Sequence, residues 1–97
     1  MSDANPQSEV IDNTEQNRFE MRIADHPAVA DYRITNNVMT FTHTEVPTEF
    51  RGQGLGQQLA RGALEFARKR GVKVKPLCPF IAHYIEKNPE FRDMLAS

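Results

Sequence analysis

Three glycines stand within five positions of this 97-residue chain, in the run Arg51-Gly52-Gln53-Gly54-Leu55-Gly56. Glycine costs roughly 0.5–1 kcal/mol relative to alanine inside regular structure, so these glycines need a local benefit. The run joins a predicted strand to a predicted helix, and the first N–H groups of a helix have no acceptor within it. Such groups bind anions, and glycine lets phosphate oxygens approach the backbone. The pattern predicts a phosphate-binding loop; the alternative is a tight turn without a ligand.

Two familiar phosphate-binding motifs do not fit this loop. A Walker loop has a Lys-Ser or Lys-Thr pair after its glycines, and a dinucleotide fingerprint has the spacing G-x-G-x-x-G. Here the spacing is G-x-G-x-G and neither pair follows it. The sequence therefore predicts neither a Walker nucleotide site nor a dinucleotide site.

Cys78, the single cysteine, directly precedes Pro79. Because proline favours the first position of a helix, Cys78 is predicted to be the N-cap residue. A helix N-terminus favours thiolate over thiol, which would make this cysteine a usable nucleophile. The alternative is a small, buried core residue.

His43 and Glu45 lie two residues apart near the end of a strand predicted over residues 38–46. Strict alternation predicts both side chains on the same face as Met39 and Phe41. If this strand neighbours the one that precedes Cys78, His43 and Cys78 would form a nucleophile–base pair. Glu45 could instead remove a proton from an attacking amine, directly or through water. The alternatives are a structural histidine and an exposed strand-end carboxylate.

The elements that must position these residues begin with strands. Alternation of apolar and charged residues predicts a strand within residues 10–23; the alternative is a hairpin that turns near Asn13 to Asn17. A second stretch breaks at His26-Pro27 and resumes as a strand. A turn at Asn36-Asn37, a pair suited to left-handed backbone, leads into the strand over 38–46. These pieces predict an antiparallel meander.

Helices dominate the second half. Helical apolar spacing predicts a helix from Gly54 to Arg70 that ends at Gly71, followed by a short strand over 72–77 and two helices that start at Pro79 and Pro89. This order predicts an α+β domain with a mostly antiparallel sheet of about five strands, a crossover helix and two C-terminal helices. The strands over 38–46 and 72–77 are predicted to lie side by side around the crossover helix.

Composition limits the class of protein. With 39% hydrophobic and 26% charged residues, the chain fits one domain over residues 9–97 after a flexible N-terminus at 1–8. Twelve Lys and Arg against 13 Asp and Glu give a net charge of −1, which predicts no nucleic-acid or membrane partner. One cysteine and no long apolar run predict a reduced, cytoplasmic protein, and the scattered histidines predict no metal site. We expect a monomer or weak dimer.

The glycine loop resembles the acyl-CoA signature of the GNAT N-acetyltransferase superfamily, R/Q-x-x-G-x-G/A. Five segments further resemble the very small GNAT-like acetyltransferases: RFE at 18–20, HTEVP at 43–47, RGQGLG at 51–56, LCPF at 77–80 and YIEKNPEF at 84–91. The resemblance covers about residues 9–96 and implies a GNAT-like core. It implies that the backbone of Arg51, Gly52, Gln53, Gly54, Leu55 and Gly56 binds the CoA pyrophosphate.

The same resemblance implies that the strand end from Glu45 through Val46 to Pro47 pairs with the pantetheine arm, and that Cys78 accepts the acyl group. Tyr84 resembles the tyrosine with which larger GNAT enzymes protonate the departing sulfur. Pro89-Glu90 replaces the glycine of that motif and one residue is added, so a core role is favoured for Tyr84.

Two functions are consistent with these residues. The first is an N-acetyltransferase that moves an acetyl group from acetyl-CoA to an amine, either a protein lysine or a small amine, directly or through acetyl-Cys78. The second is a CoA-binding module with weak or no catalysis, because only about 45 residues precede the loop and they read mainly as strands rather than as helices that would enclose an acceptor.

Overall fold

The structure is a computed structural model that describes residues 10–23, 26–47 and 54–96. The segment 1–8, predicted to be flexible, lies outside the described residues. The elements in chain order are β1 (Val10–Asn13), β2 (Arg18–Ile23), β3 (His26–Thr35), β4 (Val38–Glu45), α1 (Leu55–Arg70), β5 (Lys73–Pro76), α2 (Pro79–Lys87) and the 3-10 helix η3 (Pro89–Met94).

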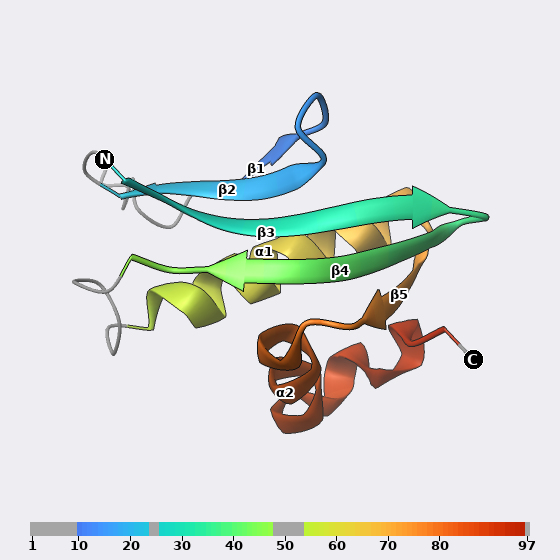
Figure 1. The fold of residues 1–97 in the computed structure, drawn as a ribbon. Coiled ribbons are helices and arrows are strands. Elements are labelled where there is room, and N and C mark those ends of the chain that lie inside the picture. The colour runs from blue at the N-terminus through green and yellow to red at the C-terminus, as the bar shows by residue number, and fades with distance from the viewer. Residues whose placement is uncertain (1–9, 24–25, 48–53, 97) are drawn as a thin grey trace, which may run out of the picture.

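The five strands form one sheet in the order β1-β2-β3-β4-β5. The first three pairings are antiparallel, and β4 pairs with β5 in parallel because α1 crosses over between them. Figure 1 shows α1 behind the sheet, and α2 with η3 beside β5, at the opposite edge from β1. The predicted α+β fold, with its crossover helix and parallel final strand pair, is confirmed.

Residues in left-handed backbone form the turns. Asn36 and Asn37 join β3 to β4 with φ angles of 53° and 64°, and Asn17 ends the β1–β2 turn with φ 55°. Gly71 ends α1 with φ 75°, and its N–H donates to the carbonyls of Ala67 and Arg68. Asparagine and glycine tolerate this backbone better than other residues, so these boundaries agree with the sequence prediction.

Two elements differ from the prediction, one in where it begins and one in its helix type. His26 and Pro27 were expected to break the strand, yet both lie in β3, where Pro27 pairs with Arg22 of β2. The last β4 pair on β3 is at Val29, so the missing N–H of Pro27 costs no hydrogen bond to β4. The final predicted helix is a 3-10 helix, Pro89–Met94.

The core lies between one face of the sheet and α1. Ala28, Ala30 and Tyr32 of β3 alternate toward this side and are buried, as are Met39 and Phe41 of β4. The buried face of α1 is formed by Leu55, Gly56, Leu59, Ala60, Ala63, Leu64 and Ala67. This shared core holds α1 against the sheet that contains β4.

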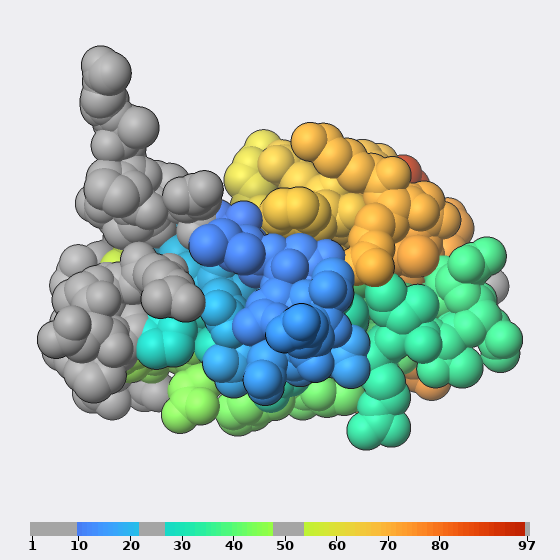
Figure 2. Space-filling model, turned by 90° about the horizontal axis from the view of Figure 1, so that it is seen from above, coloured from blue at the N-terminus to red at the C-terminus, as the bar shows by residue number. Residues whose placement is uncertain are grey.

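The edge strand β1 is held against α1 by close packing and by polar contacts. Figure 2 shows the first strands, in blue, against the yellow and orange residues of α1. A Cβ atom at Gly62 would lie 2.5 Å from Cγ2 of Val10, so glycine is needed for this approach. Asp12 accepts hydrogen bonds from the Tyr32 hydroxyl at 2.6 Å and from Arg70 at 2.8 Å. Burial and the bond to Asp12 raise the pKa of Tyr32, so this contact stabilises the fold with Tyr32 protonated.

Gly62→Ala has two opposing effects on stability. Alanine is the better helix former by about 1 kcal/mol, but overpacking against Val10 costs about 1–3 kcal/mol. The free energy of unfolding is therefore expected to fall by about 1 kcal/mol. Urea unfolding measures the change. Val10→Ala removes the opposing methyl groups, so the double variant should lose less stability than the two single variants together. Additive losses would contradict the contact between Val10 and Gly62.

Candidate active site

The edge of β4 toward β5 is only partly paired. Parallel pairing ends at Phe41 and Pro76, whereas β4 continues to Glu45 with no strand on that edge among the described residues. The carbonyl of Phe41 accepts the N–H groups of both Leu77 and Cys78, at 3.0 Å each, where the chain leaves β5. We call Thr42–Glu45 the open edge of β4. An open strand edge can pair with an extended ligand that carries amide groups.

Gly54 is the N-cap residue of α1 and has φ 77°, so no side chain caps the start of this helix. A Cβ atom built on Gly54 would meet nothing within 4 Å, so the space beside this backbone is open among the described residues. The first-turn N–H groups of α1 need acceptors from outside the helix. The described end of the glycine loop thus has the geometry of an anion site, and Arg51, Gly52 and Gln53 lie outside the described residues.

Gly56 has a packing role that the sequence reasoning missed. It is buried in the first turn of α1, and a Cβ atom there would lie 2.7 Å from Cζ of Phe80 in α2. The absence of a side chain lets the start of α1 approach the start of α2. Because α2 also contacts the end of β4 through Cys78, the three segments converge on one region.

Cys78 is the N-cap residue of α2, as predicted, and is only 5% exposed. Its side chain makes no capping hydrogen bond to the helix; the thiol instead donates to Oγ1 of Thr44 at 3.1 Å. The backbone carbonyl accepts the N–H of Ala82 at 3.1 Å. The structure therefore brings Cys78 together with the open edge of β4.

A β-bulge corrects the predicted orientation of His43 and Glu45. Tyr32 pairs with Phe41 but Asp31 pairs with His43, so β4 carries one extra residue, Thr42, between the two pairs. The bulge reverses the alternation, and the prediction that His43 and Glu45 share a face with Phe41 is wrong.

The consequence of the bulge is visible in burial. The side chains of His43 and Glu45 are 60% and 69% exposed, and Nε2 of His43 lies 3.6 Å from Oε1 of Glu45 on the face away from α1. Thr44 lies opposite buried Ala30 and faces the core side, where it contacts Cys78. The predicted Cys78–His43 pair is therefore not formed.

Comparison with known proteins decides the family. The sequence profile of the GCN5-related N-acetyl-transferase family matches residues 18–94, which include β2, the open edge of β4, α1 and Cys78. The chain belongs to the GCN5-related N-acetyltransferase (GNAT) family. The GNAT-like resemblance found in the sequence is thereby confirmed.

Relatives and a solved structure agree with this assignment. The chain is 34% identical to protein NATD1 of Gallus gallus over 56 residues, 58% of this chain and 51% of the relative. It is 40% identical to protein NATD1 of Xenopus tropicalis over 47 residues, 48% of this chain and 43% of the relative. The chain thus matches about half the length of these relatives. The NMR solution structure of a GCN5-like candidate N-acetyltransferase from Staphylococcus aureus matches with a TM-score of 0.72 and 29% identity, covering 94% of this chain and 90% of that one.

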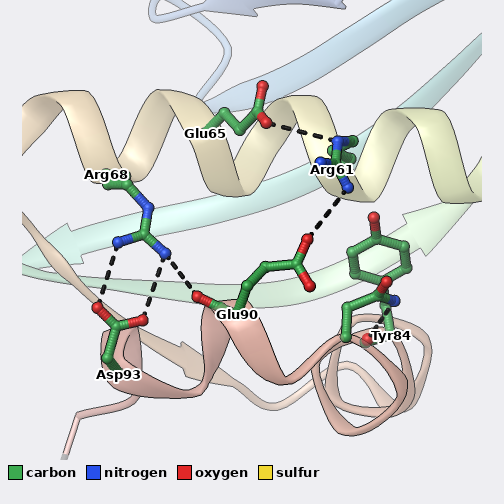
Figure 3. Close-up of polar contacts among 7 residues, drawn as sticks. Arg61, Glu65, Arg68, Tyr84, Glu90 and Asp93 are labelled. Carbon is green, nitrogen blue, oxygen red and sulfur yellow. Dashed lines mark hydrogen bonds and ion pairs between the residues drawn. The ribbon is translucent and has the colours of Figure 1, made fainter.

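Tyr84, considered as the acid of larger GNAT enzymes, is a core residue here. It is buried, and its ring centroid lies 6.0 Å from that of Phe91 in η3. Its hydroxyl, together with Glu65 and Glu90, raises the pKa of Arg61 on α1. Figure 3 shows Tyr84 beside Arg61. The prediction that Tyr84 has a core role is confirmed.

Ion pairs beside Tyr84 join α1 to η3 (Figure 3). Arg61 contacts Glu90 at 3.5 Å, and Arg68 contacts Asp93 at 3.2 Å and the carbonyl of Glu90 at 2.8 Å. The bond from Arg68 lowers the pKa of Asp93, whose carboxylate therefore stabilises the fold above the acidic range. These arginines are committed to intramolecular contacts, which supports a structural role for them over phosphate binding.

Thr44 is the residue at the site that sequence reasoning missed. The sequence contains one signal for it. Strict alternation after Phe41 would point the polar side chains of His43 and Glu45 into the core and the apolar side chain of Val46 into solvent. In the structure Val46 packs against the core. The bulge at Thr42 reverses the alternation, so the polar side chains point outward and Val46 points inward. The same change brings Thr44 to Cys78.

The sheet face away from α1 carries charged residues near the open edge. Glu20 is 6% exposed and accepts hydrogen bonds from Arg18 at 2.7 Å and Asn13 at 2.9 Å. Glu20 and Glu45 both pair with Val29, and Asp31 pairs with His43, so carboxylates from three strands share this face of the GNAT sheet. Among the described residues no group of His, Cys, Asp and Glu could hold a metal ion. Nor does any helix in the described segments have the length and apolar character to cross a membrane.

Proposed function

We propose that this GNAT protein binds acetyl-CoA where the starts of α1 and α2 meet the end of β4, and transfers the acetyl group to an amine. The observation that carries the proposal is the convergence of three features at one place. These are the uncapped start of α1 at Gly54, the open edge of β4, and a buried thiol at Cys78. Family membership supports the acetyl-transfer chemistry.

The residues fit an acyl-CoA donor by type and by available space. Backbone N–H groups at Gly54, Leu55 and Gly56 would bind the pyrophosphate, with Arg51, Gly52 and Gln53 completing the loop. The open space beside Gly54 supports this assignment, because a side chain there would occupy it. The pantetheine amides would pair with the strand end from Glu45 through Val46 to Pro47.

Two chemical routes start from this arrangement. In the stepwise route Cys78 accepts the acetyl group and then passes it to the amine. In the direct route the amine approaches from the face away from α1, and Glu45 or His43 removes its proton. The bulge separates the two routes, since it directs Thr44 toward Cys78 and the pair of His43 and Glu45 to the opposite face. The exposed carboxylate of Glu45 on that face would attract a cationic amine, a lysine side chain or a small amine.

A CoA-binding module with weak or no catalysis is the second candidate. Its supporting observation is that the exposed His43 and Glu45 lie on the face opposite Cys78, so that within the described part of the chain no histidine contact to the thiol is seen. A thiol without an adjacent base reacts more slowly. Binding of CoA itself would be unaffected by this separation.

The two functions differ in turnover. Calorimetry is expected to show CoA binding with a Kd in the micromolar range, about −8 kcal/mol. Release of free CoA from acetyl-CoA, measured with a thiol reagent, should increase when small amines or lysine peptides are added. Binding without amine-dependent release would favour the module, and the absence of CoA binding would contradict both functions.

A further inference from the structure

The thiol of Cys78 has one described hydrogen-bond partner, the hydroxyl of Thr44. The sulfur donates to Oγ1 across 3.1 Å, and the two residues are 34 positions apart in the chain. Thr44 lies within the HTEVP segment, between His43 and Glu45, and the sequence assigned it no role of its own. The contact depends on the β-bulge in β4.

The backbone around Cys78 is held on both sides. Its N–H donates to Phe41 at 3.0 Å, and its carbonyl accepts the N–H of Ala82 at 3.1 Å. These bonds attach the residue to β4 and to the first turn of α2. With the backbone fixed, the remaining freedom of Cys78 is the rotation of its side chain, and the bond to Thr44 selects one position of the sulfur.

The β-bulge is what delivers the hydroxyl. Thr42 is the extra residue of β4, and the register shift that it causes places Thr44 opposite buried Ala30. Without the bulge, alternation would place His43 on this side. Bulges frequently redirect a side chain next to an active site, and here the redirected residue is a threonine.

We propose that Thr44 is a positioning residue for Cys78 in acyl transfer; this inference rests on the proposed function, in which Cys78 accepts the acetyl group. A hydroxyl suits the task because it is both an acceptor and a donor. It accepts the hydrogen bond of the thiol at rest and donates its own hydrogen to the sulfur when the sulfur carries negative charge.

The step balances without an external base. The sulfur of Cys78 forms a bond to the thioester carbon of acetyl-CoA, and the bond between that carbon and the CoA sulfur breaks. The proton lost by Cys78 ends on the CoA sulfur, so the products are acetyl-Cys78 and free CoA. Thr44 keeps all its atoms, and its hydroxyl directs the attacking sulfur throughout.

The test compares Thr44→Val, which keeps the shape and loses the hydroxyl, with Thr44→Ser, which keeps the hydroxyl. Acetylation of Cys78 at saturating acetyl-CoA is followed by intact mass. Thr44→Val should react roughly tenfold to hundredfold more slowly, the scale of one hydrogen bond to a charged group, and Thr44→Ser should recover most of the rate. The acetyl-CoA concentration for half-maximal rate should change by less than about twofold, because a positioning role affects reaction more than binding.

Alkylation of Cys78 by iodoacetamide separates this inference from the proposed function, because it requires no acyl donor. The same order, wild type and Thr44→Ser faster than Thr44→Val, is expected, while circular dichroism verifies that each variant is folded. If wild type is never acetylated but the alkylation order holds, the stepwise function fails and the role of Thr44 in activating the thiol stands. Equal rates for Thr44→Val and wild type in both reactions would overturn the inference.

Discussion

Wild-type protein incubated with acetyl-CoA and no amine is expected to gain the mass of one acetyl group, and Cys78→Ala is expected to gain none. Cys78 is the one cysteine of the chain and lies where β4, α1 and α2 converge. Removal of a nucleophile leaves only the contribution of binding, so the rate of acetyl attachment should fall by at least about 10³-fold. Intact mass spectrometry over time gives both rates.

A matched control lies in the same helix. Tyr84→Phe removes one hydroxyl from a buried residue of α2 that faces Arg61 rather than Cys78. This variant should become acetylated at the wild-type rate. Acetylation of Cys78→Ala at the wild-type rate would contradict a role for the thiol. An unmodified wild-type protein would exclude the stepwise route, so that the direct route and the CoA-binding module would be the two remaining functions.

Gly54→Ala is expected to weaken CoA binding on the order of 10- to 100-fold, the effect of losing one or two hydrogen bonds to a charged phosphate. The added Cβ atom would meet no described protein atom within 4 Å, so it would project into the space proposed for the ligand. The free protein should also lose stability, by about 1–2 kcal/mol, because alanine is strained in left-handed backbone. Calorimetry and urea unfolding measure the two effects separately.

Gly71 offers the control for this strain. It ends the same helix with φ 75°, close to the φ 77° of Gly54, and its Cβ atom would also meet no atom of the described residues within 4 Å. Gly71→Ala should therefore lose a similar free energy of unfolding and keep wild-type CoA affinity. Equal affinity losses in both variants would show that Gly54 acts through stability and not through the phosphate site.

Local signals in the sequence were enough for most of the fold. Asn36-Asn37, Gly71 and Cys78 before Pro79 each fix the backbone through their own residue type, so the turn, the helix end and the N-cap could be predicted. The parallel pairing of β4 with β5 followed from a strand, a helix and a strand in succession.

The parts that could not be predicted depend on residues far apart in the chain. The bulge at Thr42 results from pairing with β3, and alternation within β4 alone cannot show it. The need for glycine at positions 56 and 62 comes from Phe80 and Val10, which pack on α1 from other elements. The largest error in the candidate site, the orientation of His43, thus arose from the same register shift that places Thr44 beside Cys78.

Titration of ¹⁵N-labelled protein with CoA, followed by amide NMR spectra, tests the proposed donor site most directly. Binding at the proposed site should shift the amide signals of Gly54 to Gly56, of Thr44 to Val46 and of Cys78 in a saturable manner. Shifts confined to another surface, such as the hollow of about 580 Å³ between α1 and η3 that is lined by Arg61, Arg68 and Phe91, would contradict it.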